Sequence, residues 1–368
     1  MMRVAIIHDD LMRRGGAEQV VLSMLKAYPN ADLYTLCYRP ELTYPEFKNY
    51  KIKSSFFNRI AKNERIMKIL FFPIGLLCMK WMSVWNYDVV LISNTYCAKY
   101  ASIDKRSKVF IYTYTPFRIA WDPSSYQEYN LSKGLKRFLF DQVVRLLRTI
   151  DRREAKKGNY FLSMTKETVE RVKKAGYSNE VSIIHPPVKC SNFHVAINPL
   201  DYYLIVSRLE FYKNVDLAIR VFNKVGKKLI IVGNGSKKKE LMSLAENNIE
   251  FRSGLSKEQL GELYSNCRAF IFPQHEDYGI TPLEANASGR PVIAYGKGGV
   301  LETMIPYNGQ SKKFTSLFFK EQTEDCLTAA IHLFETLEVD SAFIRSHAEQ
   351  FDESTFVEQL KKYVDERL

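Results

Sequence analysis

Glu276 and Glu284 lie eight positions apart in the stretch IFPQHEDYGITPLEANASGRPV, residues 271–292. The stretch begins with an apolar run typical of a buried strand, turns at Pro273, and continues after Gly279 into a helical pattern. In α/β proteins such a turn binds anions, because the first backbone N–H groups of a helix have no partner within the helix. The pattern therefore predicts Glu276 in a ligand-facing loop and Glu284 in the first turn of a helix.

The same residues also fit a purely structural interpretation. Thr281-Pro282-Leu283-Glu284 has the spacing of a capping box with proline just after the cap, so Glu284 would only complete a helix N-terminus. Glu276 would then be an ordinary solvated acid in a loop. Local spacing leaves both interpretations open, and the rest of the chain has to decide between them.

Cations and glycines follow other predicted strands in the second half of the chain. YYLIVSRLEFYK places Arg208 and Lys213 after an aliphatic strand, and KKLIIVGNG places Gly233 after the next one. Ligands of open parallel sheets bind beyond the carboxyl ends of the strands. These residues are therefore expected to meet Glu276 and Gly279 at one edge of a sheet.

The first half predicts the same succession of strand, glycine turn and helix. Residues 3–8 are an apolar strand pattern, and a loop with Gly15-Gly16 leads into a helical pattern. The third glycine of a dinucleotide fingerprint is absent, so the turn either contacts a phosphate or substrate or only uses the φ freedom of glycine. Residues 86–93 and 108–114 predict further strands between helical segments.

This order of elements predicts an α/β protein with two doubly wound, Rossmann-like domains. Pro186-Pro187 ends the regular pattern of the first half and precedes a predicted linker. The expected organisation is a first domain over 1–187, a linker over 188–200, a second domain over 201–352 and a C-terminal helix over 353–368. We expect that helix to cross back to the first domain.

Composition limits the function classes. With 368 residues, 46% hydrophobic and 13% aromatic, the chain suits a globular enzyme of about two domains. Its six cysteines are scattered without a CxxC pair, which argues against a zinc site or a disulfide framework and favours the cytoplasm. No cleavable signal is visible, and the apolar run over 69–79 is shorter than the roughly 20 residues that span a bilayer. The formal net charge of +12 predicts an anionic partner.

Two basic segments of the first half allow a membrane contact. Residues 56–85 mix aromatic side chains with Arg59, Lys62, Arg65 and Lys68, which fits either a helix with a solvated basic edge or an in-plane membrane contact. Residues 132–157 are a strongly basic helical pattern that we interpret as a solvated face. Its buried side is expected to contain Phe138, Val143, Val144, Leu146 and Leu147.

An aromatic loop is predicted at residues 111–122, IYTYTPFRIAWD, where a strand ends. The loop either packs around Trp121 or lines a cleft and contacts a polyhydroxylated ligand by stacking and hydrogen bonds.

Taken together, these motifs resemble the retaining family 4 glycosyltransferases, whose fold is the two-domain GT-B fold with a cleft between Rossmann-like domains. SRLEFYKNVD, VGNG, EDYGITPLEANASGRPVIA and the GG..E of Gly298-Gly299 and Glu302 occur in the family's order over about 100 residues. HDDLMRRGGAE resembles the opening of the first domain, with Asp10 in place of a tryptophan. YTYTPFRIAWD resembles a pattern in a subgroup that mostly uses GDP-activated, mannose-like sugars, but Tyr114 stands where that pattern has histidine, which leaves the sugar preference open.

The resemblance implies roles for individual residues. Arg208 and Lys213 would bind the diphosphate, whose negative charge grows as it leaves. Glu276 would contact the transferred sugar, which makes these three the catalytic candidates. The donor-binding candidates also include Glu284 for the ribose hydroxyls and Arg252 and Leu255 near the base. The full donor set is Gly16, Gly233, Arg252, Leu255, Tyr278, Gly279, Ile280, Thr281 and Glu284, and the acceptor or sugar side has Asp9, Tyr114 and Arg118.

The implied reaction is transfer of a hexose with retention of configuration to a glycan or lipid-linked acceptor. No cofactor or metal is expected, a GDP-sugar is favoured over a UDP-sugar, and nucleic acid is not an expected partner, because no recognition motif appears. The expected location is the cytoplasm, peripheral on the anionic inner face of the cell membrane.

Rival functions remain at this point. A UDP-sugar-dependent transferase or a sugar-nucleotide epimerase would have the same fold, and an epimerase would need no acceptor. A glycoside hydrolase also uses two carboxylates but has no need of Arg208, Lys213 or glycine-rich helix starts. A non-catalytic module that binds anionic lipid is the alternative from a different class.

Overall fold

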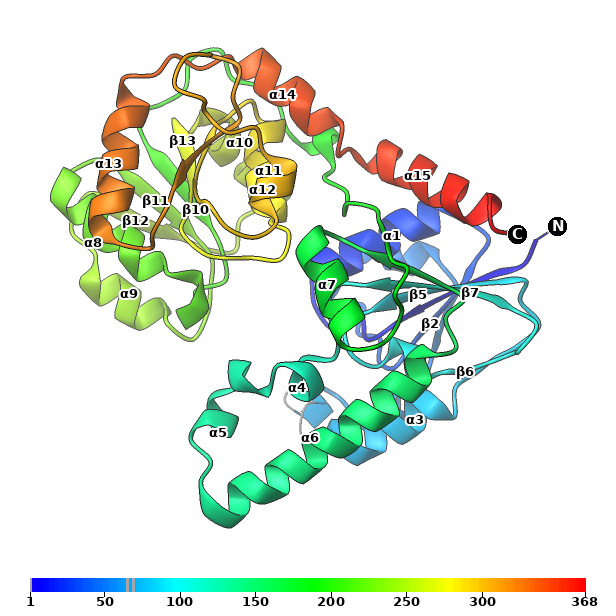
Figure 1. The fold of residues 1–368 in the computed structure, drawn as a ribbon. Coiled ribbons are helices and arrows are strands. Elements are labelled where there is room, and N and C mark those ends of the chain that lie inside the picture. The colour runs from blue at the N-terminus through cyan, green and yellow to red at the C-terminus, as the bar shows by residue number, and fades with distance from the viewer. Residues whose placement is uncertain (1, 64–65, 68–69) are drawn as a thin grey trace. The chain divides into compact units, whose positions relative to one another are not determined.

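The computed structural model describes residues 2–63, 66–67 and 70–368, which form two compact units (Figure 1). Unit 1 comprises Met1–Pro186 and Phe356–Leu368, and unit 2 comprises Pro187–Thr355. Each unit is built on its own parallel sheet, which confirms the predicted α/β class with two Rossmann-like halves.

Unit 1 has a seven-stranded sheet in the order β3-β2-β1-β5-β7-β8-β9, and every pairing in it is parallel. Its central strands are fully buried because helices cover both faces, so most of their residues are apolar, as in the VVLI of residues 89–92. The strands are β1 (Val4–His8), β2 (Asp32–Thr35), β3 (Ile52–Ser54), β5 (Val89–Asn94), β7 (Lys108–Thr113), β8 (Tyr160–Ser163) and β9 (Ser182–Ile183), and β4 (Ser83–Val84) pairs separately with β6 (Ser102–Ile103).

The helices of unit 1 include the final helix of the chain. In that helix the Phe356 ring packs 6.1 Å from the ring of Tyr112, and the hydroxyl of Tyr160 donates to the carbonyl of Arg367 at 3.3 Å. The expected return of the C-terminal helix to the first domain is therefore confirmed. The helices are α1 (Gly16–Ala27), α3 (Leu76–Lys80), α4 (Arg118–Trp121), α5 (Gln127–Asn130), α6 (Gly134–Ala155), α7 (Lys166–Lys174) and α15 (Glu353–Asp365).

The expected buried side of α6 is only partly correct. Val144 and Leu147 are buried, but Phe138, Val143 and Leu146 are exposed. The apolar residues of this helix occupy two faces, and only one of them packs against unit 1. The described part of the chain contains no helix long and apolar enough to cross a membrane.

Unit 2 has a six-stranded parallel sheet in the order β12-β11-β10-β13-β14-β15. The direction of strand succession reverses between β10 and β13, which makes that point the switch point of the sheet. The strands are β10 (Tyr203–Val206), β11 (Leu229–Val232), β12 (Ile249–Arg252), β13 (Ala269–Phe272), β14 (Val292–Tyr295) and β15 (Ser316–Phe319). The helices are α8 (Val215–Val225), α9 (Lys238–Leu244), α10 (Lys257–Asn266), α11 (Ile280–Ala287), α12 (Val300–Thr303), α13 (Glu324–Glu335) and α14 (Ser341–Glu349).

Residues 188–200, the predicted linker, pack within unit 2. The guanidinium of Arg345 in α14 donates to the carbonyls of Cys190 and Phe193, at 3.1 and 3.0 Å. The amide of Val188 donates to the carbonyl of Phe351 at 2.9 Å. These bonds fix a segment whose sequence has no regular pattern of its own.

Candidate functional site

The switch point of unit 2 brings two charged side chains together. Lys213 belongs to a short 3-10 turn (Phe211–Lys213) after β10, and Glu276 belongs to the loop after β13. Their side chains form an ion pair, with Lys213 buried and Glu276 partly exposed. The amide of Gln274 also lies 3.3 Å from the Glu276 carboxylate. Ligands bind in the crevice at such switch points in open parallel sheets, so this pair occupies the expected position for chemistry.

A glycine pair after β14 holds the loop of Glu276 in place. The amide of Gly299 donates to the carbonyl of Glu276 at 2.9 Å. Gly298 has φ +83°, and a Cβ atom there would lie 2.2 Å from the same carbonyl oxygen. Only glycine allows this approach, so Gly298 fixes the loop that carries the carboxylate.

The Gly233-Asn234-Gly235 turn supports the loop that leads to Lys213. The amide of Leu209 donates to the carbonyl of Asn234 at 2.9 Å. A Cβ atom on Gly233 would lie 1.9 Å from the carbonyl oxygen of Ser207, and one on Gly235 would lie 2.2 Å from that of Leu209. The turn needs glycine for close packing of two loops, whatever ligand it also contacts.

Arg208 lies in the same loop as Lys213 but differs from it in exposure and in ion pairing. Its side chain is exposed and makes no ion pair with any residue in the part of the chain that the structure describes. In this loop the charge of Lys213 is therefore balanced by Glu276, whereas the exposed guanidinium of Arg208 can meet an incoming anion.

The capping box predicted at Thr281 and Glu284 is wrong. Helix α11 begins at Ile280 and its N-cap is Gly279 at φ +92°, with no side-chain cap. Because the glycine adopts this conformation, the cap lies two residues before the predicted one, so Thr281 falls inside the first turn and Glu284, which was expected in that turn, lies beyond it. The hydroxyl of Tyr264 donates to the Glu284 carboxylate at 2.8 Å.

The uncapped start of α11 has consequences for ligand binding. Its first backbone N–H groups, those of Ile280 and Thr281, have no side-chain acceptor among the residues that the structure describes, and they suit an anion. Burial raises the pKa of Glu284, although the hydrogen bond from Tyr264 opposes the shift. Glu284 thus has a fixed orientation in a poorly solvated position, where its oxygens can accept further hydrogen bonds.

The remaining predicted donor residues lie in neighbouring loops or beside them. Arg252, at the end of β12, donates to Glu250 at 2.6 Å and is therefore committed to an ion pair. Leu255 is partly buried in the next loop, and Tyr278 is buried just before Gly279. Sequence reasoning missed Lys238, whose ammonium group lies 3.0 Å from Asn234 and 3.2 Å from Ser253.

The switch point of unit 1 lies between β1 and β5, and two of its predicted residues are used internally. Asp9 is buried, and its carboxylate accepts backbone N–H groups of residues 95–98, including Cys97 at 2.6 Å and Ala98 at 2.7 Å. Tyr114 is buried, with its hydroxyl 2.9 Å from that of Ser93. Asp9 therefore anchors the loop after β5, and its oxygens are occupied by backbone donors.

The other two predicted residues of unit 1 lie at helix starts. Gly16 is the first residue of α1, and Arg118 is the exposed first residue of α4. In the loop that contains Arg118, the indole of Trp121 donates to Asp151 at 2.7 Å. The packing interpretation of this aromatic loop therefore holds for Trp121.

A buried polar cluster in unit 1 was not predicted. The imidazole of His8 lies 2.9 Å from the hydroxyl of Ser93 on one side and 3.8 Å from the carboxylate of Glu18 on the other. Burial alone would lower the pKa of His8, but the hydrogen bond and charge of Glu18 and the nearby Asp9 and Asp10 raise it overall. The motif HDDLMRRGGAE could have indicated this cluster, because it begins with His8 and ends with Glu18, which contact each other.

No metal centre is formed by the residues that the structure describes. Among them, no three histidine, cysteine, aspartate or glutamate side chains converge in a way that would hold an ion. The positive charges of Arg208 and Lys213 are the groups that can balance a diphosphate at the switch point.

Residues 193–354 match the family model for glycosyl transferases group 1. The chain is 24% identical over 365 residues to the alpha-1,3/1,6-mannosyltransferase ALG2 of Dictyostelium discoideum, covering 83% of this chain and 84% of that protein. It is 25% identical over 370 residues to ALG2 of Saccharomyces cerevisiae, covering 83% and 71%.

Solved structures share the whole fold. The Anabaena protein HepE in complex with UDP superposes with a TM-score of 0.70 at 13% identity, covering 99% of this chain and 100% of that one. Sucrose-phosphate synthase from Thermosynechococcus elongatus gives a TM-score of 0.68 at 13% identity, covering 100% and 99%.

The two Rossmann-like units and the likeness to these solved structures show that the chain has the GT-B fold. The chain is a glycosyltransferase, and its residues 193–354 match the glycosyl transferases group 1 domain. The family resemblance of its motifs is thereby confirmed.

Proposed function

We propose that this glycosyltransferase moves a mannose-like hexose from a GDP-sugar to a glycan or lipid-linked acceptor. The proposal is carried by the pair of Lys213 and Glu276 at the switch point of unit 2, with the exposed Arg208 in the loop that leads to Lys213. The two cations suit a diphosphate, and the carboxylate suits the hydroxyls of a sugar attached to it.

In the proposed reaction the acceptor hydroxyl attacks the anomeric carbon on the face from which the diphosphate leaves. The bond from the anomeric carbon to the phosphate oxygen breaks, the bond to the acceptor oxygen forms, and the hydroxyl proton passes to the departing phosphate. Arg208, Lys213 and the first N–H groups of α11 stabilise the charge that develops on the leaving group. Glu276 positions the hexose and Glu284 accepts the ribose hydroxyls.

The relatives by sequence and the relatives by structure point to different donors. The ALG2 proteins are mannosyltransferases, whereas HepE was solved with UDP. We favour the GDP-sugar because the relatives by sequence extend over most of the chain, while those by structure share only the fold.

A panel of nucleotide sugars tests the donor. The melting temperature is measured with GDP-mannose, UDP-glucose and ADP-glucose, since a ligand that binds only the folded state raises it. We expect the largest rise with GDP-mannose, and release of GDP that depends on an added glycan or lipid-linked acceptor. A larger rise in melting temperature with UDP-glucose would mean that the donor is a UDP-sugar. Turnover without an acceptor would favour an epimerase.

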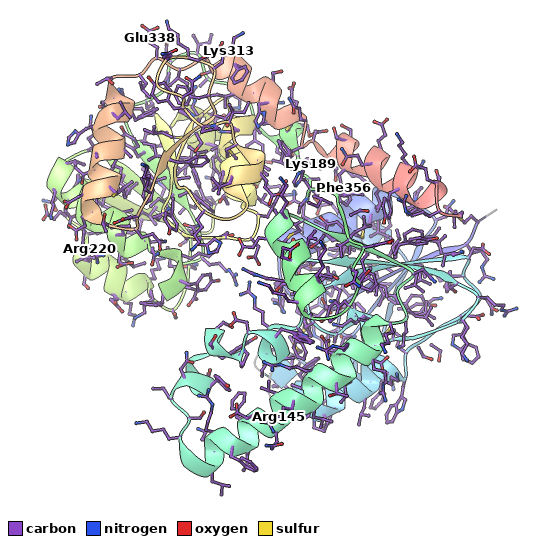
Figure 2. The ribbon with its side chains drawn as sticks, viewed as in Figure 1. Arg145, Lys189, Arg220, Lys313, Glu338 and Phe356 are labelled. Atoms are coloured by element: carbon purple, nitrogen blue, oxygen red, sulfur yellow. The ribbon has the colours of Figure 1, made fainter. Side chains whose placement is uncertain are left out.

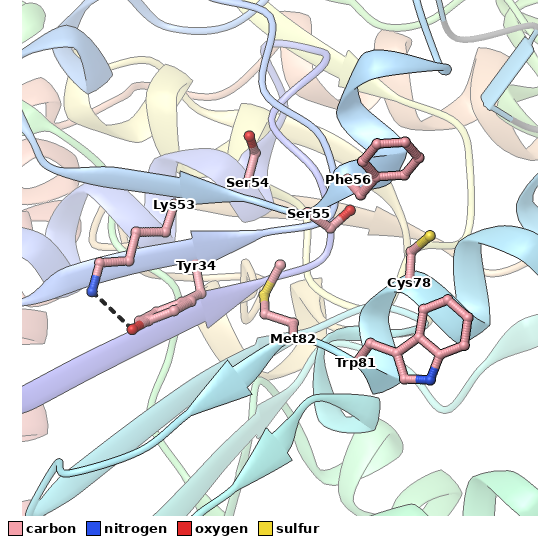
Figure 3. Close-up of a pocket in the computed structure, with 8 residues that line it drawn as sticks. All are labelled: Tyr34, Lys53, Ser54, Ser55, Phe56, Cys78, Trp81 and Met82. Carbon is pink, nitrogen blue, oxygen red and sulfur yellow. Dashed lines mark hydrogen bonds between the residues drawn. The ribbon is translucent and has the colours of Figure 1, made fainter.

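The acceptor side is proposed to work on an anionic membrane surface. Phe56, Trp81 and Trp85 expose 63%, 72% and 59% of their surface, and the chain carries a net charge of +12. Phe56 and Trp81 line a pocket of about 330 Å³ together with Cys78 and Met82 (Figure 3). Of the cations expected in this segment, Arg65 and Lys68 lie outside the described residues.

This proposal differs measurably from a lipid-binding module without catalysis. A module would bind anionic vesicles in a salt-dependent manner and would not release nucleotide from any donor in the panel. An enzyme releases nucleotide, and substitution of Lys213 stops it.

A further inference from the structure

Helix α6 has apolar side chains on two opposite faces. Val144 and Leu147 are 3% and 2% exposed, and Leu147 packs in a core cluster with Phe117 and Ala120 of unit 1. On the other side, Leu135, Leu139 and Leu146 are 73%, 54% and 54% exposed. At 3.6 residues per turn these leucines fall in one row, with the exposed Phe138 and Val143 on either side. We call these five side chains the apolar stripe.

The borders of the apolar stripe are cationic. Lys136 lies along one border and Arg145 along the other, and both are exposed. Figure 2 labels Arg145 midway along the helix. The helix as a whole contains six basic and three acidic residues. One of its acids, Asp141, pairs with Arg137.

We propose that the apolar stripe inserts into the interface of an anionic membrane, with α6 lying in the membrane plane. Leucines would enter the boundary between headgroups and acyl chains, while Lys136 and Arg145 extend to lipid phosphates on either side. The helix cannot cross the bilayer, because charged residues occur along its whole length. This inference rests on the proposed function. Docking by α6 would hold unit 1, which contains the predicted acceptor residues, at the surface where a lipid-linked acceptor lies.

Charge decides against a second copy of the chain as the occupant. The covering surface must be apolar in its centre and anionic at its edges. A second α6 offers an apolar centre but brings the same cationic borders, so like charges would face each other. An anionic bilayer supplies both properties.

Vesicle sedimentation tests the inference on the full chain. Sucrose-loaded vesicles of phosphatidylcholine alone are compared with vesicles that also contain phosphatidylglycerol. The variant Leu139→Glu with Leu146→Glu is expected to lower partition into the anionic vesicles by about tenfold or more, since each leucine loses its favourable burial. Lys136→Glu with Arg145→Glu is expected to lower it only for the anionic vesicles.

Leu333→Glu is the matched control, because this leucine is also exposed on a helix but belongs to α13 of unit 2. It should bind vesicles like the unchanged protein. All variants replace exposed side chains, so their melting temperatures should agree within a few degrees and a loss of binding is not a loss of fold.

The outcomes separate this inference from the proposed function. If the stripe variants bind anionic vesicles as well as the unchanged protein, the apolar stripe does not dock and the inference is overturned. If size measurement shows a dimer that Leu139→Glu dissociates, a second copy covers the stripe and the inference is also wrong. Loss of vesicle binding together with unchanged hexose transfer to an acceptor in free solution supports it. Vesicle binding by a protein that transfers no hexose would reject the function alone.

Discussion

Lys213 and Glu276 form an ion pair across the switch point of the second sheet and thereby join the loops after β10 and β13. Each side chain balances the charge of the other before a ligand arrives. Under the proposed function, a diphosphate that binds Lys213 takes over the contact with its ammonium group. The carboxylate of Glu276 is then free to accept hydrogen bonds from the hexose. The pair would thus couple diphosphate binding to the position of the carboxylate.

Lys213→Ala is expected to lower hexose transfer by about a hundredfold or more, because charge stabilisation of the leaving group is lost. The free energy of unfolding should fall by only about 1 kcal/mol, since Glu276 is partly exposed and water solvates it after the change. Release of GDP and urea unfolding measure the two effects. Near-normal hexose transfer by this variant would contradict the assignment of Lys213 to the diphosphate site.

Arg208→Ala is expected to separate activity from stability. The side chain is exposed, so the free energy of unfolding should change by less than about 0.5 kcal/mol. The value of kcat/KM for the donor should fall by about tenfold to a hundredfold, because a charge-assisted contact with the diphosphate is lost. Lys228→Ala is the control, because Lys228 directly precedes β11 and lies at the opposite edge of the sheet. Equal kcat/KM values for the two variants would contradict the role of Arg208.

Gly298→Ala and Gly309→Ala form a matched pair. Both glycines have positive φ, at +83° and +88°, so both variants carry backbone strain of about 1 kcal/mol. At Gly298 the added methyl group meets the Glu276 carbonyl oxygen at 2.2 Å and the His275 ring at 2.6 Å, whereas nothing lies within 4 Å at Gly309. Gly298→Ala should therefore lower the melting temperature more and reduce transfer by at least tenfold. Similar activity in both variants would show that the position of the Glu276 loop does not matter.

Much of unit 2 could be predicted from the sequence because its signals are local. Aliphatic runs followed by glycines or cations predict strands and the loops after them, and parallel topology places those loops at one edge. The pairing of Lys213 with Glu276 required the strand order, since the two residues are 63 positions apart in the sequence.

Other features depended on information that spacing does not contain. The start of α11 was predicted wrongly because the capping pattern at Thr281 competes with a glycine cap, and the conformation of Gly279 decides between them. The two apolar faces of α6 look alike in the sequence, and only packing tells which is covered. Asp9 resembled a ligand-facing acid, yet its partners are backbone amides of a distant loop.

The buried His8 of unit 1 predicts a pH dependence of stability. The pKa of His8 is raised because the hydrogen bond and charge of Glu18, with Asp9 and Asp10, outweigh its burial. A histidine whose folded pKa is raised adds stability that is fully present below its unfolded pKa of about 6.5. That contribution is lost as the pH rises through the folded value. Burial also raises the pKa of Asp10, against the charge of Arg13, but aspartate titrates from a lower starting value.

We therefore expect the melting temperature to fall from about pH 6.5 upward, and the fall to be shallower in His8→Gln. Glutamine keeps a polar group near Ser93 and Glu18 but cannot take up the proton. The control is His332→Gln, which replaces an exposed histidine in α13 of unit 2 and should leave the slope unchanged. Melting temperatures at half-unit steps of pH provide the comparison. Parallel curves for His8→Gln and the unchanged protein would mean that His8 does not gain its proton from the contact with Glu18.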